Sequence, residues 1–137
     1  MALARHATDI PEKRSALASP ITFRRSALKA LSRGLPPEHA LEFQKLVLES
    51  YIRYTPLTVE RLQAACRDGR VSDAWRHAHS LRAAARMFGS TRLLTAIDNF
   101  HMVLVTPGGC TTVAENKLLR AYEKLLRKVQ SVYAEYL

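Results

Sequence analysis

His79 is the residue of this sequence best placed to do chemistry. The apolar residues around it recur at helical spacing and would form one stripe of an amphipathic helix: Ala74, Ala78, Leu81, Ala85 and Phe88. At about 100° per residue, His79 lies about 140° from the middle of that stripe, so we expect its imidazole to face water. Arg82 and Arg86 follow on the same side of the helix. A solvent-facing histidine among cations is able to offer a ring nitrogen to an anion, and the simplest such anion is a phosphoryl group. The alternative is a solvated surface histidine without a chemical role.

The neighbours of His79 divide between the solvent-facing side and the core. His77 falls within about 60° of the centre of the apolar stripe, which predicts a histidine at the edge of the core. Trp75, one turn before His79, is either an exposed recognition aromatic or, as we favour, a half-buried bundle residue. Arg76 and Ala83 complete the set that we expect to lie near an incoming partner.

Other chemically capable side chains are interpreted as structural. His101 follows an apolar residue on the next expected helix, and Cys66 falls in a helical apolar pattern, which is typical of a small buried side chain. Asp98 is interpreted as a surface charge that is able to pair with a nearby arginine.

The net charge bounds the class of partner. The 137-residue chain carries a formal net charge of +9 with 47% hydrophobic residues, which is enough apolar content for one domain with a core. Residues 1–35 hold seven Lys and Arg against two acids, so more than half of the excess charge lies in the first quarter of the chain. This balance favours an anionic partner, either nucleic acid, an acidic protein surface or anionic lipid, unless the cations serve only solubility.

Several classes of site are missing from the sequence. Cys66 and Cys110 form no CxxC motif and no Cys/His cluster has zinc-ligand spacing, so we expect no metal site and a reducing compartment. The start of the chain lacks the continuous apolar segment of a secretory signal, and no run of about 18 apolar residues would span a membrane. We therefore expect a cytoplasmic protein. Without a nucleotide-binding glycine loop or paired carboxylates, we expect no cofactor and no autonomous kinase activity.

The elements that would position His79 are helices, because the sequence lacks sustained period-two alternation. Residues 1–18 are interpreted as a basic flexible arm, and residues 19–35 as a basic amphipathic helix that begins at Ser19-Pro20. One side of this helix is either a basic docking face or an ordinary solvated face, and it carries Arg24, Arg25, Lys29 and Arg33.

Residues 36–137 are expected to form one helical domain. Proline, glycine and cap residues predict where its helices begin and end. The first helix is expected from Pro37 to about Tyr54, the second from the Thr55-Pro56 cap to Arg67, and the third from Ser72 or Asp73 to near Gly89. A fourth is expected from Ser90 or Thr91 to about 104, and the last from the capping box Thr112-Val113-Ala114-Glu115 to the end of the chain. Each helix has one apolar side and a short connection to the next. The stable arrangement is an all-α, antiparallel four-helix bundle with an additional N-terminal helical segment.

The segment around His79 resembles the histidine-containing phosphotransfer (HPt) domain family. The family motif is roughly Ala-His-[Ser/Thr]-Leu-Lys-Gly-Ser-x-x-x-x-Gly-[Ala/Ser]-x-x-Leu, and the matching residues here are Ala78, His79, Ser80, Leu81, Arg82, Ala83, Ala84, Gly89, Ser90 and Leu93. The resemblance covers about residues 37–137 and leaves the basic arm unexplained. This chain departs from the motif where Arg82 replaces lysine, Ala83 replaces glycine and Ala84 replaces serine.

The resemblance implies that His79 accepts a phosphoryl group and relays it between receiver-domain aspartates in a two-component phosphorelay. It implies that Arg82 holds phosphoryl oxygens in place of the lysine, and that the partner also meets Ala83, Arg86, Arg76 and Trp75. The implied partners are a response-regulator receiver domain and a hybrid sensor kinase, with Mg²⁺ on the receiver only.

Two other interpretations stay open. Ala83 adds a methyl group beside the imidazole and Ala84 removes a hydroxyl, which suits a degenerate HPt-like adaptor that binds a receiver or kinase domain without phosphotransfer. The net charge suits a basic helical nucleic-acid-binding module, although no helix-turn-helix or other binding motif supports a nucleic-acid partner.

Overall fold

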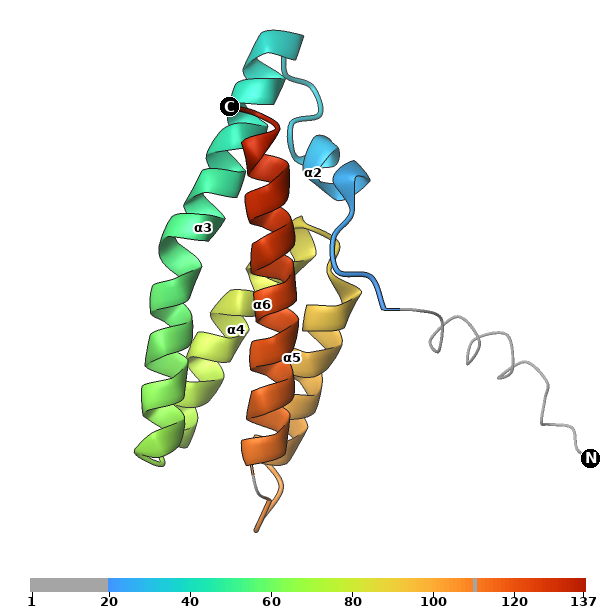
Figure 1. Ribbon diagram of the computed structural model, residues 1–137. Helices are drawn as coiled ribbons and strands as arrows, with labels where there is room; N and C mark the ends of the chain where they lie inside the picture. The colour runs from blue at the N-terminus through green and yellow to red at the C-terminus, as the bar shows by residue number, and fades with distance from the viewer. Residues whose placement is uncertain (1–19, 110) are drawn as a thin grey trace, which may run out of the picture.

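Helices make up most of the chain that the structure describes, a computed structural model of residues 20–109 and 111–137. The helices are α2 (Arg25–Leu31), α3 (Pro37–Arg67), α4 (Val71–Met87), α5 (Thr91–Leu104) and α6 (Thr112–Ala134). No strand occurs within these residues. The long helices alternate in direction, each packs on the next, and α6 closes the bundle against α3 (Figure 1). The predicted all-α bundle is confirmed, whereas the predicted arm at residues 1–18, together with Ser19 and Cys110, lies outside the described residues.

The apolar faces of the helices meet in one core. The stripe predicted for α4 is confirmed, because all of its members are buried: Ala74, Ala78, Leu81, Ala85 and Phe88. Phe88 packs edge-on against Tyr51 of α3, with ring centroids 5.1 Å apart. Burial of this stripe fixes the rotation of α4 about its own axis and thereby decides which residues α4 presents to solvent.

α3 is one continuous helix of 31 residues, so the predicted break at Thr55-Pro56 is wrong. Pro56 lies inside the helix, where it has no N–H to donate to the carbonyl of Ile52. Thr55 does not cap a new helix, because its hydroxyl donates to the carbonyl of Tyr51 at 2.6 Å. Side chains buried before and after the proline pack into the same core, and this packing holds α3 helical against the local signal.

The chain before α3 differs from the predicted helix of residues 19–35. α2 is only seven residues long, and residues 20–24 precede it without helical structure. Three hydrogen bonds tie that segment to the end of α4 and the start of α5. The Ile21 N–H donates to the Thr91 hydroxyl at 2.9 Å, the Arg92 N–H donates to the Ile21 carbonyl at 3.0 Å, and the Arg24 N–H donates to the Phe88 carbonyl at 2.8 Å. A helix that began at Pro20 would use the Ile21 carbonyl and the Arg24 N–H within itself, so the pairing with the bundle excludes it.

The turn after α4 follows the sequence prediction. Gly89 takes the left-handed φ of +63°, and the Ser90 hydroxyl accepts from the N–H of Leu93 at 3.3 Å to cap α5. Gly89 is also tightly covered, since a Cβ at this position would lie 2.8 Å from Cδ of Arg24.

Two predicted caps are wrong. α4 begins at Val71 after Arg70, and Asp73 lies inside its first turn, where it binds arginines instead of backbone N–H groups. α6 begins at Thr112 after Thr111, without a side-chain cap, so the predicted capping box does not form.

None of the described helices combines the length and the apolar content needed to cross a membrane.

Candidate functional site

His79 lies on the solvent side of α4, where the sequence placed it. Its side chain is exposed, whereas Ala78 and Leu81 on the adjoining face are buried. His77 is intermediate in exposure, as predicted for a histidine at the edge of the core. The two histidines of this helix therefore face different surroundings, and His79 is the one that an external molecule can reach.

Trp75 links His79 to α5. Its ring centroid lies 5.4 Å from that of His79, with the planes tilted by 54°. Trp75 also stacks on His101 of α5, with centroids 3.8 Å apart and an interplanar angle of 17°. Trp75 is half-buried, which confirms the prediction that it is a bundle residue. The Trp75 ring thus contacts both His79 on its own helix and His101 on α5, and His79 is the most exposed of the three.

Arg82 is held by an ion pair with Asp98 of α5. The Arg82 side chain is 25% exposed, and that of Asp98 is 54% exposed. Arg82 follows His79 by three residues, about one helical turn, and its guanidinium has five N–H donors, so the pair with Asp98 leaves donors for a second anion. The ion pair directs the Arg82 side chain toward α5.

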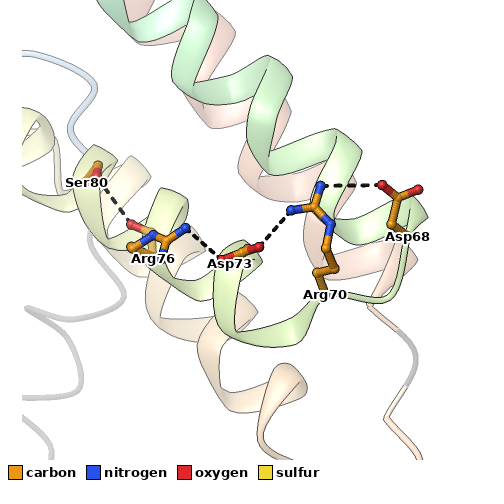
Figure 2. A network of polar contacts seen from close by, with 5 residues as sticks. All are labelled: Asp68, Arg70, Asp73, Arg76 and Ser80. Carbon is orange, nitrogen blue, oxygen red and sulfur yellow. Dashed lines mark hydrogen bonds and ion pairs between the residues drawn. The ribbon is translucent and has the colours of Figure 1, made fainter.

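The start of α4 and the turn before it contain a network of carboxylates and arginines, shown in Figure 2. Asp73 accepts hydrogen bonds from Arg70 and from Arg76, each at 2.7 Å, and Arg70 also reaches Asp68 at 3.4 Å. The bond from Arg70 lowers the pKa of the Asp73 carboxyl, and the charge of Arg76 acts in the same direction. The network ends where Ser80 donates to the Arg76 carbonyl at 3.2 Å. Arg76 is thus directed toward the start of α4 and away from His79.

Ala83 and Arg86 complete the solvent side of α4. Both are exposed, and Ala83 lies one turn after His79. Arg86 lies in the last turn of the helix, where its charge also stabilises the helix dipole. The structure therefore brings together His79, Trp75, Arg82 and Ala83, leaves Arg86 two turns away, and engages Arg76 elsewhere.

His101 and Asp98 belong to the surroundings of His79 in the structure. Spacing within α4 could not identify them, because both come from α5 and meet α4 only through tertiary packing.

Within residues 20–109 and 111–137, no group of three or more His, Cys, Asp or Glu side chains is arranged to hold a metal ion.

No protein-family model, no curated protein and no solved structure matches this chain.

Proposed function

We propose that the protein is a histidine phosphotransfer protein, which relays a phosphoryl group between receiver-domain aspartates of a two-component phosphorelay in the cytoplasm. One observation carries the proposal: a histidine on the outer side of a bundle helix, fixed there by the buried stripe behind it, with Arg82 one turn further along the same helix. The resemblance of residues 78–93 to the HPt motif supports the same conclusion.

The proposed chemistry is a direct exchange between a histidine and an aspartyl phosphate. An unprotonated ring nitrogen of His79 attacks the phosphorus, the N–P bond forms, and the P–O bond to the aspartate breaks so that the carboxylate leaves. The reverse exchange passes the phosphoryl group to a second aspartate. Arg82, three residues after His79 on the same helix, would stabilise the added negative charge through charge-assisted hydrogen bonds. Mg²⁺ is expected on the receiver domain, and the donor in the relay is expected to be a hybrid sensor kinase.

The test is transfer from a receiver domain that has been phosphorylated on its aspartate. We expect phosphate on the parent protein that is acid-labile and base-stable, and we expect none on His79→Gln. His77→Gln and His39→Gln are matched controls, because both change a histidine of the same bundle without touching the proposed acceptor. Transfer to His79→Gln at the rate of the parent would exclude the proposal.

The adaptor alternative rests on two observations at the same surface. The Ala83 methyl group is exposed beside His79, where a partner must approach closely, and Arg82 is already engaged by Asp98. If the parent binds a receiver domain without accepting phosphate, and Ala83→Gly gains transfer, the protein is an adaptor whose acceptor site has degenerated. If the parent and Ala83→Gly transfer equally, the alanine is harmless and the adaptor interpretation fails.

A further inference from the structure

A groove of about 680 Å³ lies between α5 and α6, on helices that do not carry His79. Its lining includes three alanines, which leave room for a closely approaching backbone: Ala96, Ala114 and Ala121. At the end of the groove where α5 finishes and α6 starts, Met102 and Val113 are 63% and 62% exposed. Large apolar side chains that are more than half exposed beside a groove are typical of a surface that another molecule covers.

Four cations line the same groove, and no acidic residue does: Arg92, Lys117, Arg120 and Lys124. None of the four forms an ion pair with any residue in the described part of the chain. Lys117, Arg120 and Lys124 follow one another at i, i+3 and i+7, so they form a row along one side of α6.

Four arginines outside the groove form ion pairs with acidic residues of the same chain. Arg70 and Arg76 share Asp73. Arg82 has Asp98, and Arg25 has Glu135. The positive charge of the α5–α6 groove is left without such internal compensation, and a concave surface of one charge sign attracts ligands of the opposite sign.

We propose that the α5–α6 groove binds an acidic amphipathic helix of a partner protein. A helix laid between two helices is an ordinary packing arrangement, and the alanine lining lets its backbone come near. Carboxylates at i, i+3 and i+7 of the incoming helix match the row of cations on α6, while its apolar residues cover Met102 and Val113. This surface is separate from His79 and does not depend on phosphotransfer.

The apolar end of the groove favours a protein over a nucleic acid. A phosphate backbone would use the cations but would leave Met102 and Val113 bare. Anionic lipid also fits less well, because the cations surround a hollow between two helices instead of flanking a protruding apolar face.

The test uses the full chain and a labelled 18-residue peptide designed as an amphipathic helix, with glutamates at i, i+3 and i+7 and leucines on the adjoining face. A peptide of the same composition in scrambled order is the control ligand. By fluorescence anisotropy we expect the scrambled peptide to bind at least about tenfold more weakly. Chemical-shift mapping is expected to place the peptide on α5 and α6 and not on α4.

Charge reversal tests the cation row. Lys117→Glu combined with Lys124→Glu is expected to weaken peptide binding by about tenfold or more, and Met102→Ser by about threefold. Lys29→Glu on α2 combined with Arg33→Glu in the turn after it makes the same charge change and is expected to alter binding less than about twofold. Circular dichroism checks each fold, and Lys117→Gln with Lys124→Gln replaces the double reversal if that variant unfolds.

Three results overturn the proposal. The first is equal binding of the ordered and scrambled peptides. The second is equal weakening by the α2 and α6 reversals. The third is tighter binding of a 20-base-pair DNA duplex, or of phosphatidylglycerol vesicles, that depends on Lys117 and Lys124 but not on Met102. That last result would reassign the groove to nucleic acid or to membrane lipid.

Discussion

Thr55 and Tyr122 join α3 to α6 through a hydrogen bond of 2.9 Å between their hydroxyl groups. The bond lies beside Pro56, where α3 lacks one of its own backbone hydrogen bonds. Thr55 also donates to the Tyr51 carbonyl, so a single hydroxyl braces the helix and connects it to its neighbour. A side-chain network thus supports α3 at Pro56, the residue of this helix that disfavours helical structure most.

Replacing Thr55 by valine removes this network while keeping the shape of the side chain. We expect the free energy of unfolding to fall by about 1–2 kcal/mol, because Thr55→Val also leaves the hydroxyl of the buried Tyr122 without its partner. Urea denaturation measures the change. Thr58→Val is the matched control on the same helix, since Thr58 makes no side-chain hydrogen bond within the described residues. An equal loss in both variants would show that valine alone accounts for the effect.

Cys66 is expected to be a slow nucleophile. Burial, and then the nearby Glu115 carboxylate, raise the pKa of its thiol from 9.0 to about 12. In a Cys110→Ser background, we expect iodoacetamide at pH 8 to alkylate folded Cys66 about a hundredfold more slowly than the urea-unfolded chain. Glu115→Gln is expected to speed the reaction. Rates that match in the folded and unfolded chains would contradict the raised pKa.

The same pKa gives stability a pH dependence. Because folding disfavours the thiolate, the contribution of Cys66 to stability is complete below pH 9 and is lost as pH rises toward 12. Unfolding in urea at pH 8 and pH 11 measures it. Cys66→Ala is expected to lose less stability between these two pH values than the parent does.

The pair of Arg82 and Asp98 gives a prediction that rests on the proposed function. Asp98→Asn releases the guanidinium toward the phosphoryl group, so we expect transfer to His79 to become several-fold faster, whereas Arg82→Gln slows it by about tenfold. Stability should change by less than about 1 kcal/mol in Asp98→Asn, because that carboxylate is 54% exposed. Slower transfer in Asp98→Asn would mean that the ion pair positions Arg82 productively.

The stack of Trp75 on His101 is measurable because Trp75 is the only tryptophan of the chain. We expect His101→Ala to shift the tryptophan emission and to lower stability by about 0.5–1.5 kcal/mol through loss of the stacked ring. His39→Ala, an exposed histidine on α3, is the control and should leave both quantities unchanged. Unchanged emission in His101→Ala would indicate that the rings do not stack in solution.

The placement of His79 could be predicted from sequence because it depends only on the period of one helix. The alanine-rich stripe of α4 is apolar enough to fix which side of the helix faces the core. The opposite side, which carries His79, therefore faces solvent. The helix boundary at Gly89 was also predictable, since a glycine at positive φ and a serine cap are local signals.

What could not be predicted depends on contacts between distant residues. The continuity of α3 through Pro56 requires packing on both sides of the proline and a hydroxyl from α6. The stacking partner of Trp75 comes from α5, and so does the carboxylate that holds Arg82. The failure of the capping rule at Asp73 has a local cause, because Arg70 and Arg76, each three residues away, bind its carboxylate.

The segment of residues 20–24 determines where a fragment containing the bundle must begin. Phe23 lies over Phe88, with ring centroids 5.6 Å apart, and Arg24 bonds to the Phe88 carbonyl. A fusion protein that started at Pro36 would uncover Phe88, which is otherwise fully buried at the end of the His79 helix. A fragment that keeps Phe88 covered is therefore longer than the four long helices, and it must begin before Ile21.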